Sequence, residues 1–117
     1  MSTIGAEPVR AADRRRWPRA RVHLPVRLVD TEGSFSVLRG ETVDIGVGGL
    51  RAKVDGPLSG AVETTVRIDL RRREALVCEA LVAGGGAVDD GWEYRLAFRN
   101  LDADDVAALE EVVGSAS

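Results

Sequence analysis

Apolar and polar residues alternate along most of the chain from Val22 onward, which is the pattern of β-strands that bury one face. The alternation is clearest from Val62 to Leu70, where apolar or β-branched side chains occupy every second position. A more continuous apolar run at 75–82 predicts a strand that is buried on both faces. Turn residues separate these runs and predict six short strands, at 22–29, 35–43, 50–54, 62–70, 75–82 and 92–98.

Proline and glycine positions add detail to this pattern. Pro25 has no backbone N–H to donate to a ladder, so we expect it at a sheet edge or a bulge. The segment Asp44–Gly49 holds three glycines in four residues, which predicts a tight loop with positive φ angles and a close backbone approach. Further glycines at 84–86 and 91 predict a flexible connection between the last two strands.

The period changes at the end of the chain. Asp102 is followed by further acids, which predicts a helix N-cap and a first turn that is stabilised by the helix dipole. Val106, Leu109 and Val113 lie at i, i+3 and i+7 and form one apolar stripe, and Gly114 is expected to end the helix.

Six strands followed by one helix predict an all-β-dominated fold. The expected architecture is a six-stranded antiparallel β-barrel with a C-terminal α-helix that covers one side or one mouth. Residues 1–13 show no periodicity, and we expect them to form a flexible N-terminal arm. Residues 14–117 are then a single domain, which agrees with a chain of 117 residues.

Composition excludes several classes of chemistry. The single histidine and single cysteine leave no ligand set for a Cys/His zinc site, and a lone cysteine cannot form an internal disulfide. Neither a Gly-x-Ser-x-Gly elbow nor a phosphate-binding P-loop occurs, so we expect no enzymatic activity. No apolar run reaches the length of a membrane span, and the chain is expected to be cytoplasmic. Cys78 is expected to pack as a small hydrophobe.

A basic cluster stands out against a net charge of -3. Five arginines surround Trp17 in the stretch Asp13–Arg21. Guanidinium groups match phosphates and guanine edges and stack on aromatic faces, so the cluster could hold an anion. It could also be a disordered basic tail, or a tail that screens the acidic C-terminal helix. A nucleic-acid arm is a further interpretation, but the acidic net charge argues against it.

Two motifs in this order resemble the PilZ family, whose members are bacterial receptors for the second messenger cyclic di-GMP. Arg15 and Arg19 fit the two ends of the RxxxR motif of that family. Asp44 and Gly49 fit the ends of its [D/N]xSxxG motif, whereas Gly46 stands where the family usually has serine. The Gly-Gly-Leu after the loop and a Tyr-x-Leu-x-Phe strand before the helix are also similar. The likeness covers residues 14–113, nearly the whole chain.

The resemblance implies a PilZ-like split barrel and a receptor or adaptor function without catalysis or cofactor. It implies that Arg15 and Arg19 take the phosphates and guanines of cyclic di-GMP and that Asp44 takes a guanine edge. Gly49 would keep the loop open, and Gly46 would lack one ligand hydrogen bond. The arm would become ordered when the ligand binds. The remaining candidate residues would assist this binding: Arg14, Arg16 and Trp17.

Several alternatives stay open at this stage. Asp44 could instead cap its own loop, and Trp17 could anchor the arm to the barrel rather than stack on a guanine. Since we expect no second domain, the signal would pass to an unidentified effector protein. Because of Gly46, the chain could also be a degenerate PilZ-like adaptor that binds a protein and no nucleotide.

Overall fold

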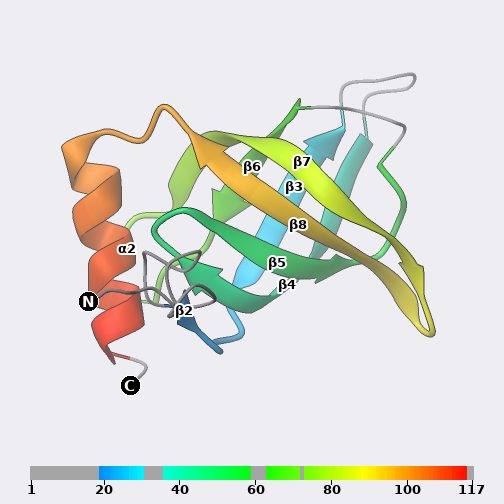
Figure 1. Cartoon of the computed structure of the whole chain (residues 1–117), viewed down its shortest axis with the longest axis horizontal. Coiled ribbons are helices and arrows are strands. Elements are labelled where there is room, and N and C mark those ends of the chain that lie inside the picture. The colour runs from blue at the N-terminus through cyan, green and yellow to red at the C-terminus, as the bar shows by residue number, and fades with distance from the viewer. Residues whose placement is uncertain (1–18, 31–35, 59–62, 72, 116–117) are drawn as a thin grey trace, which may run out of the picture.

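The computed structural model describes residues 19–30, 36–58, 63–71 and 73–115. These residues form a closed six-stranded antiparallel barrel with one additional short strand and a C-terminal helix, which confirms the predicted fold class (Figure 1). The elements in chain order are β2 (Arg19–Ala20), β3 (Pro25–Asp30), β4 (Ser36–Gly46), β5 (Gly49–Val54), β6 (Glu63–Ile68), β7 (Leu76–Val88), β8 (Gly91–Arg99) and α2 (Ala103–Ser115).

The barrel closes on β4, the strand that pairs with three others. Strands follow one another in the order β4-β3-β6-β7-β8-β5, and pairing of β5 with β4 completes the ring. β3 pairs with residues 36–41 of β4, and β5 pairs with residues 40–45 on its other edge. Gly40 lies where both pairings meet, and a Cβ there would collide with the backbone of Lys53. Glycine is therefore required at the point where the sheet bends to close.

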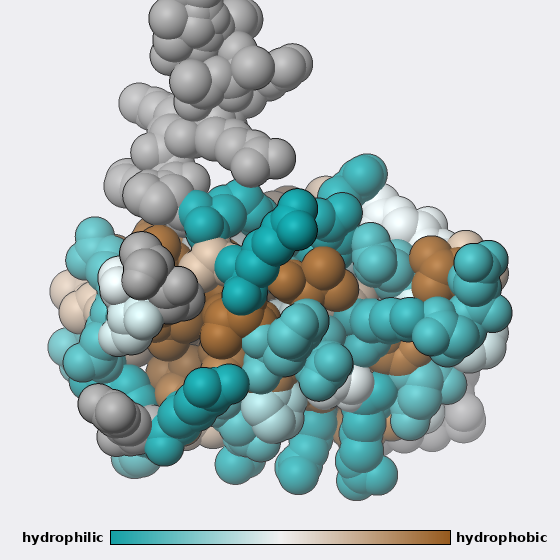
Figure 2. All heavy atoms as spheres, turned by 90° about the horizontal axis from the view of Figure 1, so that it is seen from below, coloured by the Kyte–Doolittle hydropathy of each residue, from teal (hydrophilic) through white to brown (hydrophobic). Residues whose placement is uncertain are grey.

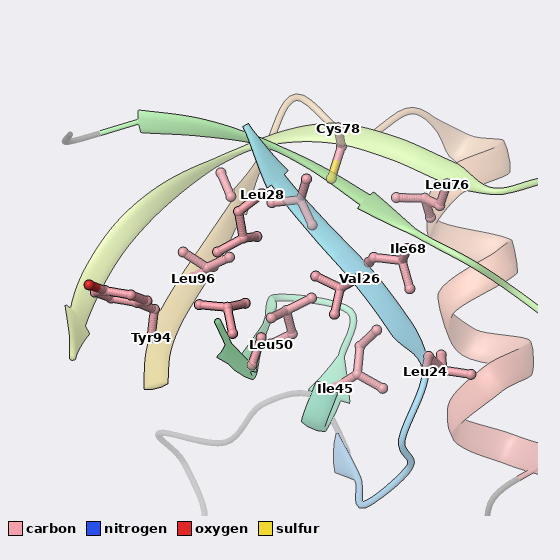
Figure 3. Packing of buried hydrophobic residues seen from close by; sticks show 14 of the residues in the cluster. Leu24, Val26, Leu28, Ile45, Leu50, Ile68, Leu76, Cys78, Tyr94 and Leu96 are labelled. Atoms are coloured by element: carbon pink, nitrogen blue, oxygen red, sulfur yellow. The ribbon is translucent and has the colours of Figure 1, made fainter. Parts of the chain in front are cut away.

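The core fills the barrel with aliphatic side chains from all six of its strands. Figure 3 shows these side chains pointing into the space that the strands enclose, with α2 beside it. Leu109 of α2 is fully buried, so the helix contributes to the same core. The largest fully buried aliphatic side chains are Val26, Leu28, Ile45, Leu50, Val66, Ile68 and Leu109. Cys78 belongs to this cluster, as predicted.

Helix α2 begins as its sequence predicts. The Oδ1 atom of Asp102 accepts a hydrogen bond from the backbone N–H of Asp105 at 2.8 Å, which is the N-cap interaction. The carboxylate of Asp105 accepts in return from the N–H of Asp102 at 3.4 Å. The predicted end at Gly114 is wrong, because the helix continues to Ser115. Gly114 is exposed and no atom lies near its missing Cβ, so the last turn accommodates it.

Two predictions about the strand β7 are wrong. Its buried and exposed residues alternate, and Val77 is 54% exposed, so only one face of the strand is buried. The outer face of a barrel strand has no second layer against it, which explains the difference. The glycines at 84–86 are also part of β7, where they pair with residues 93–95 of β8. A Cβ at Gly85 would collide with the carbonyl oxygen of Glu93, so Gly85 permits close approach of β8. The three glycines therefore belong to the paired strand and do not form a flexible connection.

The strand predicted at 22–29 begins only at Pro25, and an interruption at residues 21–24 separates it from the two-residue strand β2. Pro25 is the first residue of β3, which lies between β4 and β6, so its expected position at an edge or bulge is wrong. A strand's first residue is another position that tolerates proline. At the interruption, the buried Thr42 hydroxyl donates to the carbonyl of Val22 and accepts from the N–H of Leu24 at 2.9 Å. One side chain thus replaces ladder bonds and holds β2 in line with β3.

We expect Thr42→Val to lower the free energy of unfolding by roughly 2–4 kcal/mol, because it leaves the buried N–H of Leu24 and the partly buried carbonyl of Val22 without their partner. The shape of the side chain is nearly unchanged, so the loss reports the hydrogen bonds. Urea denaturation followed by circular dichroism measures the effect. Thr65→Val, at an exposed position of β6, is the matched control and should change stability by less than about 0.5 kcal/mol. Equal effects of the two substitutions would contradict this role of Thr42.

Candidate functional site

A β-bulge in β4 directs the carboxylate of Asp44 to the outer surface of the barrel. Thr42 pairs with Ala52, but the next pair joins Asp44 to Arg51, so Val43 is the extra residue. Strict alternation would place Asp44 on the same face as the buried Thr42. The bulge reverses this, because one inserted residue moves the following side chains to the other face. Asp44 therefore shares the outer face with Arg51.

The turn after Asp44 fixes which residue it faces. β4 ends at Gly46 and β5 begins at Gly49, so only Val47 and Gly48 connect them. Asp44 consequently lies within a strand and directly opposite Arg51. The positive φ angles predicted for this segment are wrong, since the glycines with positive φ in the described part of the chain are Gly85 and Gly91.

Two arginines hold the carboxylate of Asp44. Arg19, on β2, donates to Oδ1 from Nε at 3.1 Å and also from Nη2. Arg51 donates from Nη2 to Oδ2 at 2.8 Å, and its Nη1 lies 3.7 Å from Oε2 of Glu93 on β8. The side chain of Asp44 is 12% exposed, against 30% for Arg19 and 40% for Arg51. Charges from four strands thus form one network around a carboxylate that is nearly covered.

This network lowers the pKa of Asp44. Burial of the carboxyl acts to raise its pKa, but the hydrogen bonds and positive charges of Arg19 and Arg51 outweigh burial. The pKa therefore lies below the ordinary value of 3.8. Arg51 responds in the opposite direction, since its contact with Asp44 raises its pKa. Asp44 is an anion at neutral pH with both oxygens engaged.

Two glycines shape the surroundings of the carboxylate. Gly46 lies two residues after Asp44 and opposite Arg19 in the pairing of β2 with β4. Gly49 begins β5, and a Cβ there would collide with the carbonyl oxygen of Leu96 on β8. Gly49 therefore does not keep a loop open, as we had expected. Its missing Cβ instead allows β5 and β8 to pack closely.

The structure brings together part of the predicted site. Arg19 and Asp44 are in contact although they are 25 positions apart in the sequence, and Gly46 and Gly49 follow Asp44 along the chain. The alternative in which Asp44 caps its own loop is replaced by its ion pairs with the arginines. The other predicted members lie outside the described residues: Arg14, Arg15, Arg16 and Trp17.

Sequence reasoning missed Arg51 and Glu93 as members of this network. A short hairpin connection between Gly46 and Gly49 would have identified Arg51, because register in a hairpin follows from the length of its turn. Glu93 carried no comparable signal, since the pairing of β8 with β5 joins distant parts of the sequence.

Other features of the described residues lie apart from this network. A cavity of about 300 Å³ lies between α2 and the turn after β6 and is lined by residues that include Val22, Leu70 and Val112. Figure 2 shows apolar atoms exposed between hydrophilic side chains toward the α2 end of the molecule. The Cys78 thiol has its pKa raised to about 12, first by burial and then by nearby carboxylates, which makes it a poor nucleophile.

Metal binding and membrane insertion find no support in the part of the chain that the structure describes. No group of three or more histidine, cysteine, aspartate or glutamate side chains there could hold a metal ion. Within the same residues, no helix combines the length and apolar character needed to cross a bilayer.

The chain belongs to the PilZ family, because the PilZ domain model matches residues 13–115. Solved structures share the fold. The PilZ domain of YcgR from Escherichia coli with c-di-GMP has a TM-score of 0.70 at 15% identity, over 88% of this chain and 91% of that one. The PilZ domain of CeSA from a cellulose-synthesizing bacterium has a TM-score of 0.60 at 20% identity, over 83% of this chain and 95% of that one. No curated protein sequence matches the chain.

The inhibitor of motility MotI (DgrA) from Bacillus subtilis is also similar. Its structure has a TM-score of 0.71 at 20% identity over 86% of this chain. The present chain spans 50% of the length of that protein. The similarity therefore concerns one domain of a longer protein and shows the fold.

We expect the Asp44 carboxyl to titrate below pH 3.8 in the folded protein. Because its pKa is depressed, the ionised form stabilises the fold. That contribution is complete above the unfolded pKa and is lost as pH falls through the folded pKa. Carbon-detected NMR of the Asp44 side chain measures the titration directly. Arg51→Met should raise the pKa of Asp44, whereas Arg99→Met, at a residue that pairs with Glu63, should leave it unchanged. A value above 3.8 in the unsubstituted protein would contradict the network.

Proposed function

We propose that this chain is a receptor for cyclic di-GMP, with the outer surface around Asp44 as the binding site. The observation that carries the proposal is the direct contact of Arg19 with Asp44, which joins the two motifs of the family at one place on the barrel. The E. coli protein YcgR, whose fold this chain shares, has been solved in complex with c-di-GMP. PilZ domains act as receptors or adaptors, and the proposal involves no catalysis.

The residue types suit the ligand. Cyclic di-GMP carries two phosphates and two guanines, and an arginine can make two hydrogen bonds to the O6/N7 edge of guanine or pair with a phosphate. Arg15 and Arg19 take these groups in the proposed complex. Asp44 accepts from the N1–H and N2–H edge of a guanine, for which an ionised carboxylate is the suitable partner.

Binding requires an exchange of partners at Asp44. Both oxygens of its carboxylate already accept from arginines, so a guanine must displace one of them. Arg51 is the more exposed of the two, and Glu93 offers it a second carboxylate. In the proposed mechanism Arg51 moves toward Glu93 and Arg19 turns toward the ligand. The guanidinium charges then stay compensated throughout the exchange.

The signal then passes to a partner protein. Arg19 is at the start of the described chain, directly after the segment that carries the rest of the RxxxR motif. Binding of Arg15 and Arg19 to one ligand would change the surface that a partner protein meets at this end of the described chain. An effector protein that contacts that surface would detect the ligand.

A second candidate function is an adaptor that binds protein and no nucleotide. Two observations favour it. Gly46 supplies no hydroxyl where the family usually has serine. The Asp44 carboxylate is also satisfied within the chain, so the ion pairs with Arg19 and Arg51 can serve the fold alone. The two functions differ in whether the isolated chain binds cyclic di-GMP.

Calorimetric titration with cyclic di-GMP tests the receptor function. We expect saturable binding, and we expect Arg19→Ala to weaken it by about 10–100-fold, since hydrogen bonds to charged groups contribute about 1.5–3 kcal/mol. Arg99→Ala is the matched control, because Arg99 pairs with Glu63 away from the site. Gly46→Ser should tighten binding by up to about ten-fold through one added hydrogen bond. No heat and no saturation with the unsubstituted chain would support the adaptor instead.

Glu93→Gln tests the exchange at Asp44. Removing the charge of Glu93 takes away the second partner of Arg51, so displacement from Asp44 becomes more costly. We expect affinity for cyclic di-GMP to fall by about three- to ten-fold while the pKa of Asp44 stays below 3.8. Calorimetry and NMR titration measure the two quantities. Unchanged affinity in Glu93→Gln, with normal binding by the unsubstituted chain, would remove Glu93 from the mechanism and leave the receptor function intact.

A further inference from the structure

Three arginines form a row across the outer face of the barrel, on strands that lie beside one another. Arg27 of β3 is directly opposite Arg39 of β4 on one side and Arg67 of β6 on the other. All three are exposed. In Figure 1, β3 lies behind β5 and β8, so this face points away from the viewer. We call these three arginines, together with the exposed valines Val37 and Val77 beside them, the arginine row.

Such an arrangement works against the stability of the sheet. Like charges directly opposite each other on neighbouring strands are destabilising, and here Arg27 is involved twice. Several cations elsewhere on the barrel surface do have partners: Arg51 faces Asp44, Lys53 pairs with Asp90 and Arg99 with Glu63. Within the described residues, no carboxylate forms an ion pair with the side chain of Arg27 or Arg39, and Arg67 reaches only Asp69 at 3.5 Å.

Exposed apolar side chains border the arginines. Val37 is 41% exposed and pairs with Val29 in the neighbouring register position. Val77, which is 54% exposed, lies opposite Arg67 at the end of the row. Arginine beside exposed apolar surface is the composition of protein interfaces, in which arginine is enriched. Three arginines bordered by valines are a poor match for a nucleic acid, which requires many phosphate contacts and offers nothing to the valines.

We propose that the arginine row is a docking surface for an acidic helix of a partner protein. Neighbouring strands are about 4.8 Å apart, so the three guanidinium groups are anchored at intervals of about 5 Å along a line across the strands. A helix rises about 1.5 Å per residue, so acids at i, i+3 and i+7 are spaced about 4.5 and 6 Å apart and match that line. Apolar residues on the adjacent stripe of the helix would cover Val37 and Val77.

The docking surface is separate from the proposed ligand site and does not depend on it. Both use β4, but Arg39 lies in the part that pairs with β3, and Asp44 lies in the part that pairs with β5 and β2. A partner can therefore occupy the arginine row while cyclic di-GMP occupies the surface around Asp44. Failure of one function leaves the other testable.

The first test concerns the row itself. Arg27→Glu converts two repulsive cross-strand pairs into attractive ones, so we expect the folding equilibrium constant of the full chain to rise by roughly five-fold. Arg99→Glu, which breaks the contact with Glu63, is the matched control and should lower that constant. Denaturation in urea at low salt measures both. A loss of stability in Arg27→Glu would show that other groups already neutralise the repulsion between the three arginines, and would overturn the proposal.

The second test measures docking. The probe is an alanine-based helical peptide with glutamates at i, i+3 and i+7 and valines on the adjacent stripe, and its control has glutamine for glutamate. We expect the full chain to bind the glutamate peptide about ten-fold more tightly than its control in fluorescence anisotropy, and Arg27→Glu to abolish the difference.

Equal binding of the two peptides, or binding that Arg27→Glu leaves unchanged, would overturn the proposal. Tighter Arg27-dependent binding to duplex DNA or to phosphatidylserine vesicles would also overturn it, because the partner would then not be a protein. Arg27-dependent self-association in sedimentation velocity would replace the partner with a second copy of the chain.

Discussion

The ion pairs of Asp44 with Arg19 and Arg51 hold together the strands β2, β4 and β5 on one part of the surface of this PilZ domain. A carboxylate that is 12% exposed needs compensation for its lost hydration, and two guanidinium groups provide it. Arg19 comes from β2, which has only two residues and pairs with the end of β4. The contact with Asp44 therefore helps to hold the beginning of the described chain against the barrel.

In the proposed receptor function, the same contact couples ligand binding to folding at this surface. A ligand that uses Asp44 and Arg19 must compete with an ion pair that already satisfies both. The bulge at Val43 makes the carboxylate of Asp44 accessible to a ligand, since without the bulge this carboxylate would face the core. Thr42, one residue earlier, is fully buried and connects the backbone on both sides of the interruption between β2 and β3. One short part of β4 thus supports both the fold and the site.

Charge is distributed unequally over the barrel. Around Asp44 opposite charges alternate across β2, β4, β5 and β8, whereas on the face of β4, β3 and β6 three arginines oppose one another. Cross-strand pairs of opposite charge stabilise a sheet and like pairs do not. Retaining the second arrangement costs stability, which is what makes that face stand out as a surface for another molecule.

The sequence by itself determined most of the barrel strands and the helix with its Asp102 cap, because alternation and capping are local properties. It also indicated Arg19 and Asp44 through the spacing of two motifs. Tertiary structure alone decided that Gly84–Gly86 belong to a strand, that Pro25 begins an inner strand and that Glu93 joins the site. Each of these depends on register between segments that are distant in the sequence, and one bulged residue changes which face a side chain occupies.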